Sequence, residues 1–383
     1  MPMSASPNPS DLYRLVGEMD GCRKLSATFY GRVASDPLLS PLFPSLHCAV
    51  EALAVFLAQI LGGPCEHSRR SWWLSLHESH LRFQIGQPER DAWMNNMLKA
   101  LDDVRLEEPS RGALVRFFEQ SSTYLMNRQD RTGPAASAIH PDIAPPWDAQ
   151  LVLDEVVAAV RKGDATRVMD LVERPDLQSW FTRDRAAFVS LLALFSGTSH
   201  DDLLAYVRKA LLANPELVRE GYSNGRTLLH GAAEAGNQAV VELLLSLGAD
   251  PNSTQGGHTP LYCLGNACTA PTGPDVVRLL VQAGANVNTQ SGVKKCAALH
   301  MAARRGNVSI AAALLDCAAN IEARDSMGDT PLRRAVNCAK PEMVAFLLSR
   351  GADIHAVGSK GLTPVQAARG PRLKVILQDH AKK

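Results

Sequence analysis

The sequence lacks the features that direct a protein into a membrane or onto nucleic acid. No apolar run approaches the roughly 18 residues that a membrane-spanning helix needs, and the first residues do not show the charged and then apolar pattern of a secretion signal. Charge of one sign is also missing, because 40 Lys and Arg residues are balanced by 39 Asp and Glu residues. This balance excludes a strong general attraction to nucleic acid or to an anionic membrane. We expect a cytoplasmic protein with neither kind of partner.

Cysteine patterns of metal sites and covalent cofactor sites are absent as well. The eight cysteines are scattered, with no C-x-x-C pair and no C-x-x-C-H motif. This spacing predicts reduced, mostly buried thiols, and it excludes a haem attached through thioether bonds. Glycine-rich phosphate loops, Ser/His/Asp sets and paired catalytic carboxylates are also missing. The sequence therefore offers no motif of a common enzyme class.

Length and patterning indicate several domains. With 383 residues, of which 46% are hydrophobic and 21% charged, the chain is globular and too long for a single ordinary core. A stretch rich in proline and small residues, 131–148, separates two regions of different pattern. We expect a first domain over residues 1–130 and a Pro-rich linker without helix or strand over 131–148, with Trp147 docking it onto the next domain. The second domain is expected over 149–383.

The first region has the periodicity of an all-α domain. Apolar residues recur at helical spacing in segments that begin near Asp11, Asp20, His47, Pro88 and Ser110. Pro88 suits the first turn of its helix, where its missing N–H costs nothing. Residues 65–79 are polar and less regular. Periodicity alone predicts an all-α fold with an aromatic interior and no particular function.

Several short motifs in residues 11–127 occur in the order and spacing of a known family. They are Phe29-Tyr30, Asp36-Pro37-Leu38-Leu39, Leu42-Phe43-Pro44, Phe56-Leu57, Gly62-Gly63-Pro64, His80-Leu-x-Phe-x-Ile and Arg90-Asp91-Ala92-Trp93-Met94. On these motifs the region resembles the group 2 truncated haemoglobins, which are small helical-sandwich globins. The resemblance covers about a third of the chain.

This resemblance implies a haem b cofactor and a binding site for dioxygen or another diatomic gas. His80 would be the axial ligand to the haem iron, with its neutral imidazole on the metal. Tyr30 and Trp93 would direct a hydroxyl and an indole N–H at the bound gas. Such donors in a dry pocket stabilise a partially charged ligand by a few kcal/mol at most, which favours slow release.

Three further residues would shape the pocket in the family pattern. Phe43 would stack on the haem face, Ala49 would keep the distal side small and apolar, and Leu53 would form its wall. Two histidines leave alternatives open for the metal. His77 lies one helical turn before the predicted ligand, and His47 opens the helix on the distal side.

The sequence departs from the family in the segment before the ligand. The family has arginines there that neutralise a haem propionate, whereas residues 71–79 of this chain contain none. Arg69, Arg70 or Arg82 could substitute for them. The departure motivates an alternative, in which the globin-like domain no longer binds haem and the chain serves as a scaffold.

Internal repetition dominates residues 149–383. Short motifs open successive units, 32 to 38 residues apart, at Thr227, Thr259, Ala297, Thr330 and Thr363. Each unit continues as helix, break and helix, and ends in a turn such as Leu-Leu-x-x-Gly-Ala-Asp. The units resemble ankyrin repeats, which stack into an α-solenoid and bind other proteins on a concave face. Degenerate units are expected over 156–172 and 186–218, with regular repeats from about residue 224.

Details of the repeats also follow from their pattern. Ala318 replaces the glycine of its turn and must adopt a left-handed backbone at a cost of about 1 kcal/mol. The longest unit carries an insertion near 268–274, between its two helices. His230 and His300 stand where the ring bonds the turn of the repeat, which favours a structural role.

Together the two regions predict a haem-binding globin joined to a module that binds an unidentified protein. Gas sensing and nitric oxide or oxygen redox chemistry both fit this combination. No reductase motif accompanies the globin-like region, so an enzymatic role would depend on electrons from another protein.

Overall fold

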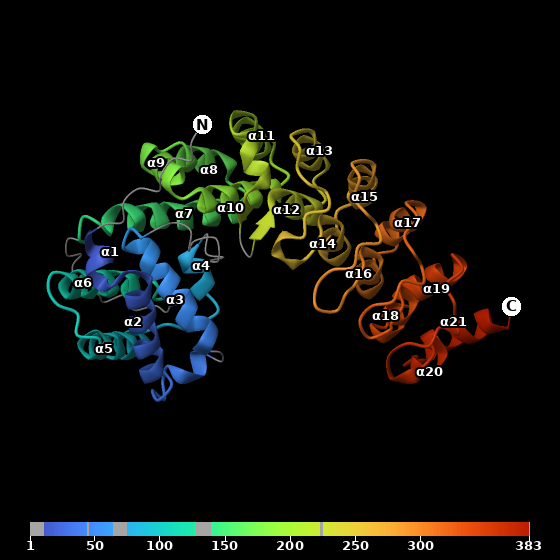
Figure 1. Ribbon diagram of the computed structural model, residues 1–383, viewed down its shortest axis with the longest axis horizontal. Coiled ribbons are helices and arrows are strands. Elements are labelled where there is room, and N and C mark those ends of the chain that lie inside the picture. The colour runs from blue at the N-terminus through green and yellow to red at the C-terminus, as the bar shows by residue number, and fades with distance from the viewer. Residues whose placement is uncertain (1–10, 44–45, 64–74, 128–138, 223–224, 383) are drawn as a thin grey trace. The chain divides into compact units, whose positions relative to one another are not determined.

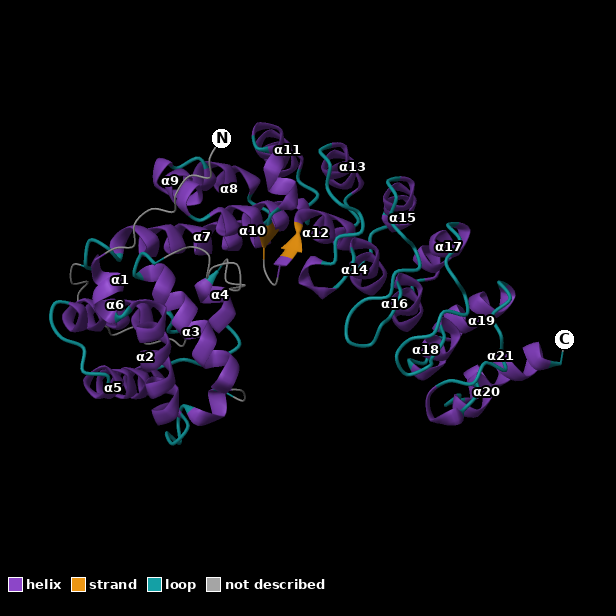
Figure 2. Cartoon of the chain, in the orientation of Figure 1, coloured by secondary structure: helices purple, strands orange, loops and turns teal. Residues whose placement is uncertain are grey.

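The computed structural model describes residues 11–43, 46–63, 75–127, 139–222 and 225–382. The chain divides into two compact units, Met1–Ser190 and Leu191–Lys383. Both are helical, and the described strands are two residues long, β1 (Gly221–Tyr222) and β2 (Arg226–Thr227) (Figure 2). The expected all-α class is therefore confirmed. Across the described ranges, no helix is both long and apolar enough to cross a membrane.

The first unit consists of helices that are named in chain order in Figure 1. They are α1 (Asp11–Val16), α2 (Glu18–Val33), η1 (Ser40–Leu42), α3 (Leu46–Ile60), α4 (Leu76–His80), α5 (Gln87–Asp103), α6 (Ser110–Tyr124), α7 (Ala144–Lys162), α8 (Ala165–Val172), α9 (Pro175–Arg183) and the first residues of α10 (Arg185–Ser196). As predicted, α5 begins at the Gly-Gln-Pro signal, with Pro88 in its first turn.

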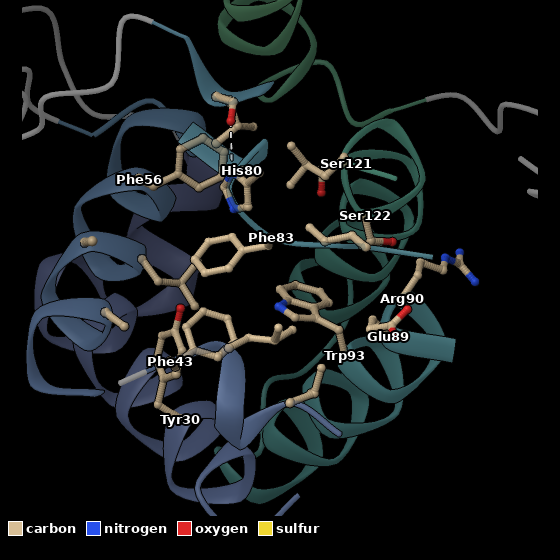
Figure 3. A pocket seen from close by; sticks show the side chains of 18 of the residues that line it. Tyr30, Phe43, Phe56, His80, Phe83, Glu89, Arg90, Trp93, Ser121 and Ser122 are labelled. Atoms are coloured by element: carbon tan, nitrogen blue, oxygen red, sulfur yellow. Dashed lines mark hydrogen bonds between the residues drawn. The ribbon is translucent and has the colours of Figure 1, made fainter. Parts of the chain in front are cut away.

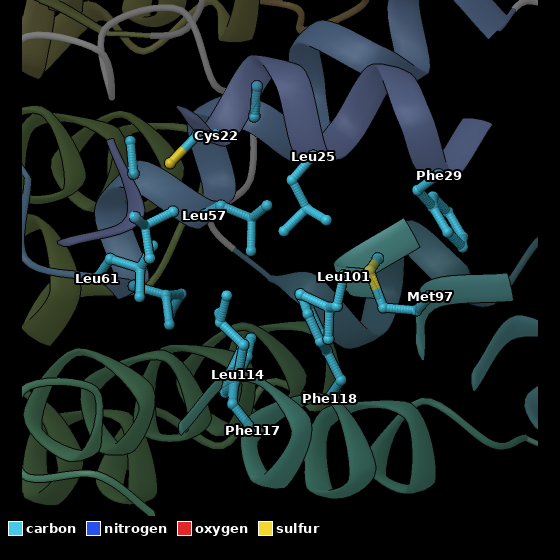
Figure 4. Close-up of a cluster of buried hydrophobic side chains, with 14 of the residues drawn as sticks. Cys22, Leu25, Phe29, Leu57, Leu61, Met97, Leu101, Leu114, Phe117 and Phe118 are labelled. Carbon is cyan, nitrogen blue, oxygen red and sulfur yellow. The ribbon is translucent and has the colours of Figure 1, made fainter. Parts of the chain in front are cut away.

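The core of the first unit lies between α2, α3, α5 and α6. Helix α2 packs against α3 and α5, and α6 packs against α5. Large apolar side chains that are at most 1% exposed fill the space between them, as Figure 4 shows: Leu25, Phe29, Leu57, Leu61, Met97, Leu101, Leu114, Phe117 and Phe118. Burying this apolar surface stabilises the layers around which the candidate site is built.

Helix α7 corrects the expectation of a linker without secondary structure. It begins at Ala144, so residues 144–148 are helical, while residues 128–138 of the expected linker lie outside the described residues. Trp147 is 3% exposed and packs edge-on against Phe117 and Tyr124 of α6, with ring centroids 5.4 and 5.7 Å apart. It therefore docks onto the helices of the first region and not onto the domain that follows. Pro145 and Pro146 lie in the first turn of α7, where proline is compatible with a helix. In the sequence the same prolines gave the segment the composition of a linker.

Helix α4 lies partly in the stretch that is polar and less regular in sequence, and its helical structure has a source outside that stretch. The hydroxyl of Ser75 caps this short helix by accepting a hydrogen bond from the Glu78 backbone N–H at 3.1 Å. A carboxylate from α7, Asp154, accepts from the first N–H of the helix, that of Leu76, at 2.7 Å. The helix thus depends on a partner far away in the sequence, which local pattern does not reveal.

The second unit consists of helix pairs stacked side by side (Figure 1). After α10 its elements are α11 (Asp201–Ala213), η3 (Pro215–Arg219), α12 (Leu228–Ala235), α13 (Gln238–Ser246), η5 (Gln255–Gly257), α14 (Pro260–Ala267), α15 (Gly273–Gln282), α16 (Ala298–Arg305), α17 (Val308–Asp316), α18 (Pro331–Asn337), α19 (Pro341–Ser349), η6 (Ser359–Gly361), α20 (Pro364–Ala367) and α21 (Pro371–Ala381). Helices α12, α14, α16, α18 and α20 each pack against the next, and so do α11, α13, α15, α17, α19 and α21. Strands β1 and β2 pair antiparallel, with Gly221 opposite Thr227.

The repeat details predicted from the pattern are confirmed. Ala318 has a φ of 64°, which is the left-handed conformation that glycine adopts at the equivalent positions of other repeats. Residues 268–272 connect α14 to α15, whereas only Gly236 and Asn237 connect α12 to α13, so the insertion lies between the helices.

The two repeat histidines have the structural role that was expected. His230 is fully buried, where its Nδ1 accepts from the Thr227 backbone N–H at 3.1 Å and its Nε2 donates to the carbonyl oxygen of His258 at 2.8 Å. His300 is also fully buried and makes the equivalent bonds to Ala297 and Asp329, each at 3.2 Å. Each ring thus ties one repeat to the next.

Candidate functional site

A cavity of about 440 Å³ lies inside the first unit, between α2, α3, α5 and the segment that follows α4. Its lining is predominantly apolar and aromatic. The six residues that the family resemblance assigned to the pocket all line it: Tyr30, Phe43, Ala49, Leu53, His80 and Trp93. Figure 3 labels four of them, Tyr30, Phe43, His80 and Trp93. Residues up to 63 positions apart in sequence, Tyr30 and Trp93, thus reach a single space. A cavity of this size and character is typical of a binding site for a small molecule or cofactor.

His80 is the last residue of α4, and its ring faces the cavity. Its Nδ1 lies 2.8 Å from the carbonyl oxygen of Leu76, one helical turn earlier, and 2.9 Å from the hydroxyl of Ser79. Because a carbonyl oxygen can only accept, Nδ1 carries the proton and Nε2 keeps a lone pair. Burial lowers the pKa of His80, which favours the neutral ring. A neutral imidazole with its proton on Nδ1 is the form in which histidine binds a metal through Nε2.

Tyr30 and Trp93 bring hydrogen-bond donors to the same cavity. Figure 3 shows the Tyr30 side chain across the cavity from His80, and the indole nitrogen of Trp93 turned toward the interior. Among the described residues neither the Tyr30 hydroxyl nor the Trp93 N–H has a hydrogen-bond partner. Burial raises the pKa of Tyr30, so its hydroxyl stays protonated and able to donate. Donors without a partner in an apolar cavity are unfavourable unless a ligand accepts from them.

Aromatic rings form the walls around these groups. Phe43 meets Tyr30 edge-on with centroids 5.3 Å apart, and Phe83 lies between Phe43, at 5.8 Å, and His80, at 6.0 Å. Ala49 and Leu53 line the cavity from α3. Flat apolar surfaces of this kind suit a planar, hydrophobic ring system better than a polar metabolite.

Two arginines lie at the edge of the cavity, Arg82 and Arg90. The Arg82 guanidinium stands 4.7 Å from the Phe83 ring centroid. Arg90 pairs with Asp91 at 3.1 Å through one nitrogen, while its buried Nε has no partner among the described residues. Arg82 is one of the three arginines that were expected to replace those of the family. Arg69 and Arg70, the other two, lie outside the described residues.

The alternative histidine ligands differ from His80 in their placement. His77 does not line the cavity; its ring packs beside that of Tyr124, with centroids 5.7 Å apart. His47 lies in the first turn of α3, but its side chain is outside the described residues. In the described part of the chain, no group of three His, Cys, Asp or Glu side chains is arranged to hold a metal ion. Among the histidines whose side chains are described, His80 is the one that faces the cavity.

Several residues of the site were missed by sequence reasoning. Phe83 was part of a recognised motif, and its position three residues after His80 on a helical turn could have suggested that the two rings meet. Arg90 had a similar signal, one turn before Trp93 on α5. Asp154 is a lone acid in the apolar face of α7, next to Leu153, which marks it as unusual without revealing its partner.

The residues around the cavity fit a haem group. A neutral imidazole that faces the cavity, aromatic walls and the donors of Tyr30 and Trp93 match what an iron porphyrin and a small gas need. Arg82 and Arg90 supply positive charge at the rim, where carboxylate side chains of the porphyrin would require it.

Comparisons with known proteins agree with this geometry. Residues 11–127 match the family model of the bacterial-like globins, and residues 198–291 and 264–357 match that of the ankyrin repeats. The group 2 truncated hemoglobin YjbI of Bacillus subtilis is 37% identical over 119 residues, which are 31% of this chain and 89% of that protein.

The repeat region resembles parts of larger proteins. Human ankyrin repeat and SOCS box protein 16 is 36% identical over 166 residues, which are 40% of this chain and 36% of that protein. Human B-cell lymphoma 3 protein is 36% identical over 170 residues, which are 40% of this chain and 35% of that protein. The chain thus spans about a third of the length of each of these two relatives.

Proposed function

The chain belongs to the group 2 truncated haemoglobin family through residues 11–127, with ankyrin repeats behind them, and we propose on this premise that it binds haem b through His80. The observation that carries the proposal is the His80 ring, which faces an apolar cavity while Nδ1 holds the ring proton and donates it to the carbonyl oxygen of Leu76. This is the tautomer that a histidine needs in order to bind iron through Nε2.

When bound, haem supplies an iron with an open coordination position at which a diatomic gas such as dioxygen binds. Tyr30 and Trp93 donate hydrogen bonds to a gas molecule held in the cavity. Each such bond in a dry site is worth roughly 1 kcal/mol, so the two donors together slow the release of the gas. Ala49 and Leu53 keep this side of the cavity small and exclude water.

Phe43 and Phe83 would hold the porphyrin by apolar packing. Such packing would be needed because the sequence has no motif for thioether attachment. Arg82 and Arg90, which also line the cavity, would hold its carboxylates. These two arginines take the role of the family residues that are missing from residues 71–79.

The ankyrin repeats would bind a partner protein, so that the globin and its partner are kept together. Two uses fit this combination: relaying the presence of a gas to the partner, or oxygen and nitric oxide redox chemistry with electrons from another protein. A cytoplasmic location is consistent with reduced cysteines, since those of the described ranges are all free.

The absorption spectrum of the purified protein after addition of haem tests the proposal. The wild type should show a Soret band that is lost or strongly shifted in His80→Ala. The matched control is His77→Ala, which changes a histidine of the same helix that lies outside the cavity and should keep the band. A wild type without a Soret band would instead support an ankyrin scaffold with an empty globin fold.

A further inference from the structure

Asp154 is a buried carboxylate that α7 places against α4, the helix that carries His80. It is 5% exposed and lies beyond residues 11–127, which match the globin family. Its two oxygens accept hydrogen bonds from the backbone N–H groups of Leu76 (2.7 Å) and His77 (3.1 Å), from the Tyr124 hydroxyl (2.8 Å) and from the Gln150 amide (2.9 Å). A buried carboxylate is unfavourable unless its oxygens are bonded in this way, so the site is built to keep a negative charge at the start of α4.

The peptide group that joins Leu76 to His77 connects this charge to His80. Its N–H donates to Oδ2 of Asp154, and its carbonyl oxygen accepts from Nδ1 of His80 at 2.8 Å. Hydrogen bonds in series polarise one another, so a carboxylate on the N–H makes the carbonyl at the other end a stronger acceptor. A stronger acceptor draws the Nδ1 proton away from the ring and makes Nε2 a better donor to a metal.

We propose that Asp154 is a positioning residue of the haem site, which strengthens the bond between His80 and iron through the peptide between Leu76 and His77. The inference rests on the proposed function, because it takes His80 as the axial ligand. A helix outside the matched globin region thereby completes the proximal side of the site. A second link between the same two helices, the ion pair of Arg161 with Glu78 at 2.8 Å, holds α4 in place.

The alternative is that Asp154 only caps the N-terminus of α4, where a carboxylate is favourable in any helix. The two roles predict different effects on the bond between His80 and iron. A cap alone changes the stability of α4, whereas polarisation of the peptide changes the strength of the iron–histidine bond in a helix that remains folded.

The test compares full-length variants in resonance Raman spectra of the ferrous, gas-free haem protein, in which the iron–histidine stretching frequency reports the bond directly. Asp154→Asn keeps the shape of the side chain and removes its charge. Asp154→Glu keeps the charge and serves as the conservative rescue. Glu155→Gln is the matched control, because it removes an exposed carboxylate from the next position of α7, where it pairs with Arg167. Hydrogen exchange of residues 75–80 and of α6 in each variant shows separately whether the fold is kept.

We expect a lower iron–histidine frequency in Asp154→Asn and haem loss that is about 10-fold faster or more, which is typical for removal of a group behind a metal ligand. Asp154→Glu should lie closer to the wild type, and Glu155→Gln should match it.

An unchanged frequency in Asp154→Asn would overturn the inference and leave Asp154 as a cap. If Asp154→Asn does not fold, Asp154→Glu decides, because its longer side chain displaces the carboxylate from the peptide. Its frequency should then be measurably below that of the wild type, and a frequency equal to that of Glu155→Gln would overturn the inference. If the wild type takes up no haem, the proposed function itself is wrong. The Soret band of the wild type tests this before any variant is compared.

Discussion

The Nδ1 atom of His80 lies 2.8 Å from the carbonyl oxygen of Leu76, one turn earlier in the same short helix. This contact fixes the tautomer and the orientation of the ring, and it directs the other nitrogen at an apolar cavity. The Tyr30 hydroxyl and the Trp93 N–H reach the same cavity from other helices.

Tyr30→Phe should speed the release of bound oxygen about fivefold, because it removes one hydrogen bond of roughly 1 kcal/mol and leaves the ring in place. Stopped-flow measurement of the oxygen dissociation rate checks this. Tyr13→Phe is a suitable control, since Tyr13 is 2% exposed but does not line the cavity. Equal dissociation rates in Tyr30→Phe and the wild type would remove the hydroxyl from its proposed role.

Arg90→Gln should raise the rate of haem loss about two- to fivefold, because an ion pair near the surface is worth at most about 1 kcal/mol. Transfer of haem to an acceptor apoprotein measures this rate. Arg111→Gln provides the comparison, because Arg111 forms an ion pair of 2.8 Å with Asp102 and does not line the cavity. If both substitutions have the same effect, Arg90 does not hold a haem carboxylate.

Ala318→Gly should stabilise the repeats by about 1 kcal/mol, because glycine adopts the φ of 64° without the penalty that a Cβ atom brings. Gly351→Ala at the equivalent turn of the next repeat should destabilise them by a similar amount. A Cβ there would meet open space, so the backbone alone sets the cost. Hydrogen exchange of α17 and α19 reads out both changes, and a loss of protection in Ala318→Gly would contradict the account.

The repeats should lose stability as the pH falls below about 6.5, the usual pKa of an unfolded histidine. Burial lowers the pKa of both His230 and His300 in the folded state. The unfolded chain therefore binds more protons below that pH, so the stabilisation is complete above it and is lost on acidification. Urea unfolding at several pH values should show a shallower pH dependence in His300→Asn than in the wild type. His355→Asn, at an exposed position, should leave the dependence unchanged.

The sequence predicted the cavity residues better than the helices that support them. Tyr30, Phe43 and His80 were found because each belongs to a short motif at family spacing, and the repeat turns were found by their periodicity. Helix α4 and the docking of α7 were missed for a common reason. Asp154 caps a helix 78 residues away, and Trp147 packs on rings of α6, so neither partner can be recognised from the neighbouring sequence.

The most direct test of the central claim removes the axial ligand and then replaces it. His80→Gly leaves a space beside the iron and should abolish the normal Soret band of the haem-loaded protein. Added imidazole, which restores the missing ring without its link to the backbone, should bring the band back toward the wild-type position. A wild-type spectrum in His80→Gly without imidazole would show that another residue binds the iron and would contradict the account.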